Sequence, residues 1–209
     1  MTLGLSPIKA VLFDLDGTLV HSALDFMQIR KDIACPAECD ILEYLTRLNE
    51  SDRNKAEAII QRHELEDAQN VECIPGVEQT LAGLVEQGIR TAIITRNSRE
   101  ATFVKLAKLN LSIEHVLTRE DAPAKPHPGA LLHFSNLWQI QPRECVYVGD
   151  YKYDLQAARN ANMHGGLYCE QGLANLPDYA DQADFIFESF MSFEDQLLKY
   201  LNGKAPQRM

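Results

Sequence analysis

The sequence predicts an α/β fold built on a doubly wound parallel sheet. Six short apolar runs recur along the chain, and each is bounded by polar or glycine-containing turns. The runs are too continuous for half-exposed strands, so they resemble strands that are buried on both faces. They occupy residues 9–14, 89–95, 114–118, 145–150, 165–169 and 184–189. Helical patterns lie between them, and such alternation of strands and helices is typical of a parallel sheet.

Helices are expected at residues 76–88, 99–110, 127–138 and 153–162. In the first of these, Val77, Leu81 and Leu84 recur at helical spacing, and Gly88 is placed to end the helix. In the third, Pro128 stands near the first turn, where proline is tolerated.

Residues 21–74 interrupt the alternation, because they show helical patterns only. Helices are expected within 25–33, 38–49 and 51–63, and their apolar stripes are typical of helices that pack on one another. We therefore expect a core domain of residues 1–20 and 75–209 and a small all-helical domain of residues 21–74, inserted after the first strand. The tail at 202–209 is expected to fray.

Composition excludes several classes of function. The 209 residues include 20 basic and 30 acidic ones, and the resulting charge of −10 repels nucleic acid and anionic lipid. No apolar stretch approaches the roughly 18 residues of a membrane span. The five cysteines have no paired spacing, so free thiols are expected rather than disulfides or zinc. We expect a cytoplasmic protein, monomeric or homodimeric, that binds a small molecule.

Polar side chains stand at the ends of four predicted strands. They are Asp14 and Asp16, then Thr95, Arg96 and Asn97, then Lys125 in the loop after the third strand, and finally Asp150 and Asp154. In open α/β sheets ligands bind beyond the carboxyl ends of the strands, so these residues are expected to form one site. Converging carboxylates repel one another, and Mg²⁺ together with Lys125 would offset that repulsion and attract an anionic substrate.

Each of these residues also has an ordinary structural interpretation. Asp and Gly in "DLDG" favour turns, and Asp150 and Asp154 fit the first turn of a helix. A lysine such as Lys125 is most often solvated. The four strand ends taken together favour a site.

Four motifs in this order resemble those of the haloacid dehalogenase-like hydrolases. They are "DLDGT" at residues 14–18, "IITRN" at 93–97, "KPHP" at 125–128 and "GDYKYD" at 149–154. The helical insert is similar to the short cap of one branch of that family, which includes phosphoglycolate phosphatases. The resemblance implies a Rossmann-like core and a hydrolase.

The resemblance also implies roles for the residues. Asp14 would be the nucleophile and form an aspartyl-phosphate. Asp16 would act as general acid and then as base, with its backbone carbonyl on Mg²⁺. Thr95 and Lys125 would bind the phosphoryl group, assisted by the backbone around Arg96 and Asn97. Asp14 and Asp150 would bind Mg²⁺, with Asp154 as a ligand or as a neighbour of the ligands.

Asp16 favours a phosphate ester over a haloacid as substrate, because an alkoxide needs a proton to leave and a halide does not. We expect a Mg²⁺-dependent phosphatase for a small phosphorylated metabolite, with 2-phosphoglycolate as the first candidate. A phosphomutase and a phosphate-binding protein without turnover remain alternatives. His21 stands where relatives usually have an aspartate. A carboxylate on the substrate would need a cation from the insert, and Arg30, Lys31, Arg47 and Arg62 are unranked candidates.

Overall fold

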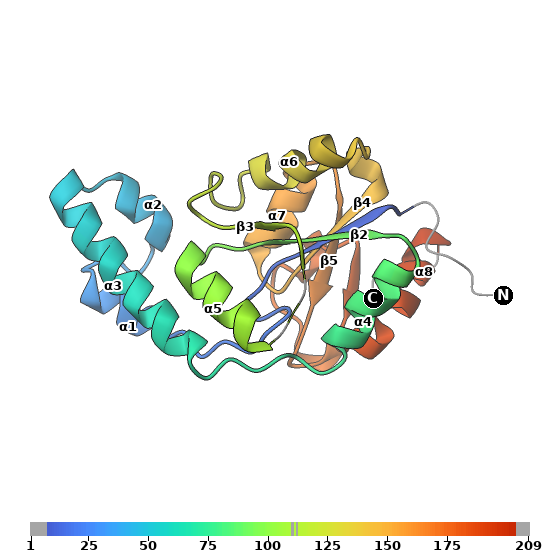
Figure 1. Ribbon diagram of the computed structural model, residues 1–209, viewed down its shortest axis with the longest axis horizontal. Coiled ribbons are helices and arrows are strands. Elements are labelled where there is room, and N and C mark those ends of the chain that lie inside the picture. The colour runs from blue at the N-terminus through green and yellow to red at the C-terminus, as the bar shows by residue number, and fades with distance from the viewer. Residues whose placement is uncertain (1–7, 110, 112, 204–209) are drawn as a thin grey trace.

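The computed structural model describes residues 8–109, 111 and 113–203, and its centre is a six-stranded parallel sheet (Figure 1). The strand order is β3-β2-β1-β4-β5-β6. The strands are β1 (Ala10–Phe13), β2 (Arg90–Ile94), β3 (Val116–Leu117), β4 (Cys145–Gly149), β5 (His164–Tyr168) and β6 (Phe185–Phe187). All six expected strands are present, so the predicted α/β fold class is confirmed.

The register of β1 creates the crevice that the fold offers to a ligand. Phe13 pairs with Ile93 of β2 on one side and with Val148 of β4 on the other. The chain builds β2 and β3 on one side of β1 and then returns to build β4, β5 and β6 on the other. The order therefore reverses between β1 and β4, and ligands bind at such switch points.

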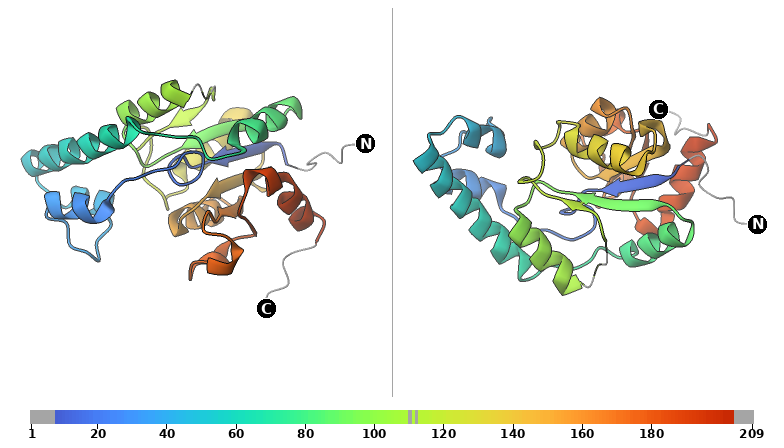
Figure 2. Two further views of the ribbon diagram at one scale, coloured as in Figure 1. Left: turned by 90° about the horizontal axis from the view of Figure 1, so that it is seen from below. Right: turned by 45° about the horizontal axis from the view of Figure 1, so that its top comes forward.

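Helices cover both faces of the sheet, as Figures 1 and 2 show. On one face lie α4 (Val77–Glu86), α5 (Arg99–Leu109) and α8 (Phe193–Leu201), and on the other lie α6 (Gly129–Trp138) and α7 (Lys152–Asn160). Alternate residues of β1 serve the two faces: Val11 and Phe13 join the first apolar cluster, whereas Leu12 joins the second. The sheet is thus buried on both sides.

The four helices expected between strands are all present, and α8 is an element that the sequence analysis did not predict. Short 3-10 turns occur at Pro142–Glu144, Leu173–Asn175, Ala180–Gln182 and Phe190–Ser192. Asn202 and Gly203 form a turn after α8, and the remainder of the tail that was expected to fray lies outside the described residues. All five cysteines are free thiols, as expected. Within the described ranges, we find no helix with the length and apolarity needed to cross a membrane.

The segment 21–74 consists of three helices that lie beyond the carboxyl ends of the strands (Figure 1). They are α1 (Phe26–Asp32), α2 (Ile41–Thr46) and α3 (Glu50–Ala68). The side chains of Asp25, Asp40 and Asn49 cap their first turns. The helices share an apolar cluster that includes Ile29 and Ile60. The helix expected within 51–63 continues to Ala68, and the assignment of 21–74 as a separate domain stays a prediction.

The two connections between this helical segment and the sheet lie side by side. The amide of His21 donates to the carbonyl of Glu72 at 2.9 Å, and the amide of Ile74 donates to the carbonyl of Leu19 at 3.0 Å. The second half of α3 then packs along α5, which is visible in both views of Figure 2. The helical segment therefore faces the carboxyl edge of the sheet, where the crevice opens.

Candidate active site

Three carboxylates meet at the switch point between β1 and β4. Asp14 follows β1 directly, Asp150 follows β4, and Asp154 lies in the first turn of α7. One oxygen atom from each carboxylate lies within 4.8 Å of the others. Mg²⁺ prefers such oxygen ligands, so the donor set fits the ion that the sequence analysis implied.

Two glycines make this close approach possible. Gly17 has a positive φ of +73°, and a Cβ atom there would lie 2.5 Å from Oδ2 of Asp150. A Cβ atom at Gly149 would lie 2.2 Å from Cγ of Asp154. Any larger residue at either position would displace the carboxylate of Asp150 or of Asp154. The close packing therefore favours glycine at both positions.

Lys125 is the buried cation of the cluster. Its Nζ atom lies 2.7 Å from Oδ1 of Asp14 and 2.6 Å from Oδ1 of Asp154. The same atom donates to the hydroxyl of Tyr147 at 2.9 Å, and this hydroxyl donates to the carbonyl of Ile94 at 3.0 Å. Lys125 is thus held from several directions, which fixes its charge beside Asp14.

The charges of the cluster do not balance without a further cation. Burial raises the pKa of Asp14 to about 7, although Lys125 opposes the rise. Burial and the nearby charge of Asp154 also raise the pKa of Asp150 well above its usual value. Burial alone lowers the pKa of Lys125, but Asp14 and Asp154 outweigh it and raise that pKa overall. A divalent cation would relieve the excess negative charge and favour ionised Asp14.

Asp16 stands apart from the three carboxylates. Its Oδ1 atom accepts a hydrogen bond from Lys105, and its Oδ2 atom accepts one from the side-chain amide of Asn97. Burial raises the pKa of Asp16, against the lowering effect of Lys105. Both carboxylate oxygens of Asp16 are thus engaged by Asn97 and Lys105. If Asp16 contacts a metal, as the resemblance implies, it would do so through its backbone carbonyl.

The residues after β2 differ in their contacts. Oγ1 of Thr95 accepts a hydrogen bond from the amide of Asn97 at 3.1 Å. Nη2 of Arg96 lies 2.6 Å from Oδ1 of Asp40, at the start of α2, and its guanidinium stacks 4.9 Å above the ring centroid of Tyr153. Arg96 therefore joins the sheet to the helical segment.

One pocket of about 420 Å³ brings together all eight residues that the sequence analysis placed in the site. These are Asp14, Asp16, Thr95, Arg96, Asn97, Lys125, Asp150 and Asp154. The opposite wall comes from the helical segment and is mostly apolar, with Leu24, Ile29 and Ile60 among its residues. The volume lies in the range that is typical of sites for small molecules.

Among the four candidate cations of the helical segment, Arg30 alone lines this pocket. Its Nη1 atom donates to the carbonyls of Pro36 and Cys39, which hold the guanidinium in place. Arg47 instead pairs with Glu43 on the surface, and Arg62 lies near Glu66 outside the pocket. The structure thus ranks the candidates that the sequence left equal.

The two histidines near the motifs have separate positions. His21 pairs with Glu170 at 2.8 Å and is not among the residues that line the pocket. Nδ1 of His127 accepts a hydrogen bond from the amide of Gly129 at 3.0 Å, at the start of α6. His127 therefore binds the first turn of α6 and is not among the residues that line the pocket.

Several residues of the site region were missed by sequence reasoning. Lys105 on α5 binds Asp16, and Arg119 pairs with Glu64 of α3, whose carboxylate also accepts the amide of Ser98 at 3.0 Å. A signal for Lys105 existed, because it lies on the same helical face as Ala101 and Leu106 and thus on the buried side of α5.

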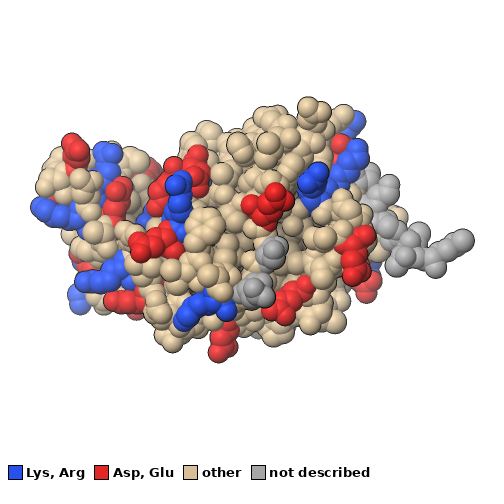
Figure 3. Space-filling view, in the orientation of Figure 1, with Lys and Arg blue, Asp and Glu red and all other residues tan. Residues whose placement is uncertain are grey.

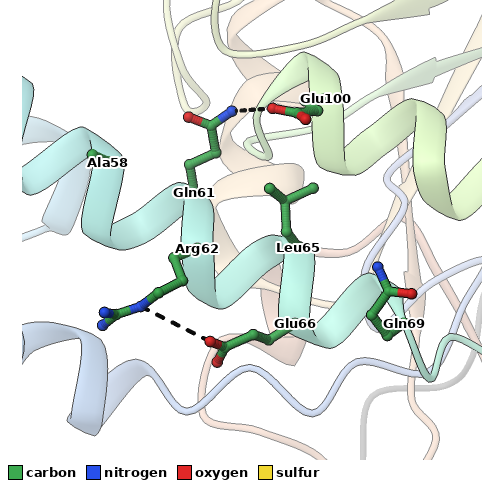
Figure 4. A pocket seen from close by; sticks show the side chains of 7 residues that line it. All are labelled: Ala58, Gln61, Arg62, Leu65, Glu66, Gln69 and Glu100. Carbon is green, nitrogen blue, oxygen red and sulfur yellow. Dashed lines mark hydrogen bonds and ion pairs between the residues drawn. The ribbon is translucent and has the colours of Figure 1, made fainter.

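A second hollow, of about 440 Å³, lies along α3 and is shown in Figure 4. Its polar side chains bind one another: Gln61 donates to Glu100 at 2.6 Å, and Arg62 lies 3.9 Å from Glu66. None of its seven lining residues comes from the strand ends, so the hollow is separate from the carboxylate cluster. On the face of the molecule in Figure 3, basic and acidic side chains are interspersed.

Comparisons with known proteins point in one direction. The family model described as haloacid dehalogenase-like hydrolase matches residues 11–166. A haloacid dehalogenase-like hydrolase domain-containing protein of Arabidopsis thaliana is 28% identical, over 91% of this chain and 84% of its own. A phosphoglycolate phosphatase of Cupriavidus necator is 33% identical, over 75% of this chain and 79% of its own.

The fold has counterparts among solved structures. A hydrolase from Pseudomonas syringae superposes with a TM-score of 0.75 at 21% identity, and the match covers 95% of this chain and 100% of the other. At this identity the likeness concerns the fold, and it matches the sheet and helices described above.

Proposed function

Because the chain belongs to the haloacid dehalogenase-like hydrolases, we propose that it is a Mg²⁺-dependent phosphomonoester hydrolase that forms an aspartyl-phosphate. The observation that carries the proposal is the convergence of Asp14, Asp150 and Asp154 around the buried amine of Lys125. Phosphoryl transfer depends on positioning and on stabilising negative charge, and this arrangement supplies both.

In the proposed reaction Oδ1 or Oδ2 of Asp14 attacks the phosphorus atom, and the bond from phosphorus to the ester oxygen breaks. Lys125 holds Asp14 in place and offsets charge on the phosphoryl oxygens. Thr95 and the backbone that follows it bind those oxygens. A water molecule then attacks the aspartyl-phosphate and releases inorganic phosphate.

Asp16 is proposed to give a proton to the leaving alcohol and to take one from the attacking water. Its place beside Asn97 at the wall of the pocket supports this role. Asp14 and Asp150 would hold Mg²⁺, with Asp154 as a ligand or a neighbour of the ligands. The ion would supply positive charge at the phosphoryl group.

A small phosphorylated metabolite is the proposed substrate, and 2-phosphoglycolate is its first candidate. The relative from Cupriavidus necator, which is named a phosphoglycolate phosphatase, supports this choice. Arg30 supports it as well, because it is a cation of the helical segment that lines the pocket and could receive the carboxylate.

The test is a screen for phosphate release from a panel of phosphorylated metabolites, with and without Mg²⁺, ranked by kcat/KM. We expect release that requires Mg²⁺ and that favours small monoesters. A positional isomer of a sugar phosphate, formed without free phosphate, would indicate a mutase. Binding of phosphate compounds without any turnover would indicate a protein that has lost catalysis, and would contradict the proposal.

A further inference from the structure

Lys105 is a buried cation that the proposed reaction does not use. Its side chain is 0% exposed, and its Nζ atom contacts two carboxylates, Asp16 and Asp67. The distance to Oδ2 of Asp67 is 2.6 Å. Lys105 is not among the residues that line the pocket, whereas Asp16 is. Any effect of Lys105 on the reaction must therefore pass through Asp16.

The bond from Lys105 determines which oxygen of Asp16 is available at the pocket. Lys105 occupies Oδ1 from the interior, whereas Oδ2 is bound by Asn97, which lines the pocket. Oδ2 is thus the atom on the substrate's side. A carboxyl group that transfers a proton must hold one oxygen at the leaving group, and an anchor on the other oxygen provides that orientation.

Asp67 connects the same lysine to the helical segment. It lies in the last turn of α3, where its Oδ1 atom accepts the amide of Ala23 at 2.7 Å and its Oδ2 atom accepts the hydroxyl of Ser22 at 3.2 Å. Ser22 and Ala23 belong to the outgoing connection of the helical segment. Lys105 therefore ties Asp16 to the place where both ends of that segment meet.

Stability alone is a weak explanation for this arrangement. Burying a lysine is costly, and buried ion pairs can often be replaced by apolar residues without loss of stability. Lys105 also brings two carboxylates to one cation, and without it Asp16 and Asp67 would repel each other. The repulsion would turn Asp16 away from its place in the pocket wall.

We propose that Lys105 is a positioning residue: it holds Asp16 in the orientation for proton transfer and, through Asp67, links that orientation to the helical segment. The inference rests on the proposed function, in which Asp16 protonates the leaving group.

The test compares two substrates of similar shape, phenyl phosphate and 4-nitrophenyl phosphate. Phenolate needs a proton to leave, whereas 4-nitrophenolate needs it much less. We expect Lys105→Met to lower kcat for phenyl phosphate by about 10²-fold and to lower kcat for 4-nitrophenyl phosphate by less than about 10-fold. KM should change little, because Lys105 does not contact the pocket. Asp67→Asn should shift the ratio of the two kcat values in the same direction.

Two further variants separate positioning from folding. Lys105→Arg keeps the charge and should restore part of the kcat for phenyl phosphate. Lys108→Met removes a lysine of the same helix that binds the carbonyl of Gln69, and it should leave both kcat values unchanged. If Lys105→Met does not fold, the kcat ratio of Asp67→Asn decides instead.

Equal losses with both substrates, or no loss with either, would overturn the role of Lys105 and leave the proposed function standing. An unchanged kcat ratio in Asp67→Asn would do the same. A wild-type protein that hydrolyses no phosphomonoester would overturn the proposed function, and the role of Lys105 with it.

Discussion

The Nζ atom of Lys125 lies 2.7 Å from Oδ1 of Asp14, and both side chains are almost entirely buried. The same nitrogen lies 2.6 Å from Asp154, so one cation serves two carboxylates while Asp150 stands within the same group. This excess of negative charge in a buried place is the feature on which the proposed Mg²⁺ dependence rests.

Replacing Lys125 by methionine should damage both activity and folding. The variant leaves Asp14 and Asp154 without their cation, and losing one partner of a buried ion pair costs about 3–5 kcal/mol. Phosphate release should fall by about 10²- to 10³-fold, by analogy with the loss of one donor to a transition state. Denaturant unfolding and kcat/KM measure the two effects. Wild-type activity in this variant would contradict the role of Lys125.

Gly17→Ala should weaken Mg²⁺ binding, because its Cβ atom would collide with Oδ2 of Asp150 at 2.5 Å. We expect a loss of affinity of about 10- to 100-fold, the scale seen when groups that orient metal ligands are changed. Gly88→Ala is a matched control, since Gly88 has the same φ of +73° and nothing within 4 Å. Calorimetric titration with Mg²⁺ measures both. Wild-type affinity in Gly17→Ala would contradict the collision argument, and an equal loss of affinity in both variants would attribute the effect to backbone strain instead.

The metal-free protein should lose stability as pH rises through the neutral range. The pKa of Asp14 is raised from 3.8 in the unfolded chain to about 7 in the fold, so the folded state binds this proton more tightly. The associated stability is fully present below pH 3.8 and is lost as pH rises toward and past 7. The raised pKa of Asp150 acts in the same direction.

Thermal unfolding in the presence of a chelator, between pH 5 and pH 8, measures this effect. Tm should fall across the range, and Mg²⁺ should raise Tm most at the upper end, where the carboxylates are ionised. Asp14→Asn should flatten the dependence. Carboxyls with lowered pKa, such as Asp40, titrate below this window. A Tm that rises from pH 5 to pH 8 without metal would contradict the charge argument.

Arg30→Gln should alter substrate preference rather than chemistry. If Arg30 binds a carboxylate of the substrate, kcat/KM for 2-phosphoglycolate should fall by at least about 10-fold, the loss expected for a charged hydrogen bond of roughly 1.5–3 kcal/mol. Phosphate esters without a carboxylate should be affected much less. Arg62→Gln serves as control, because Arg62 does not line the pocket. Equal losses for both kinds of ester would argue against this contact.

Much of the fold follows from local sequence. Continuous apolar runs such as 145–150 form buried strands, because both faces of a parallel sheet are covered by helices and neither face is in contact with water. The polar residues that follow these runs meet because parallel strands bring their carboxyl ends to one edge. For Asp14 and Asp150 this reasoning was enough to place them together.

The remainder depends on contacts between distant parts of the chain. The helical pattern places Lys105 on the buried face of α5, but its partners come from residues 16 and 67, and local pattern does not identify them. The pairing of Arg96 with Asp40 and of Arg119 with Glu64 depends likewise on how the helical segment docks. The signal for α8 was present in Phe193 and Leu197, which are buried four residues apart.

The most direct test of the proposed mechanism is to trap the covalent intermediate. The protein is incubated with Mg²⁺ and its best phosphomonoester substrate and quenched in acid, and its peptides are analysed by mass spectrometry. The proposed mechanism predicts one added phosphoryl group on the peptide that contains Asp14, and none in Asp14→Asn, which should also release no phosphate. Hydrolysis by Asp14→Asn at the wild-type rate, or a phosphoryl group on another residue, would contradict it.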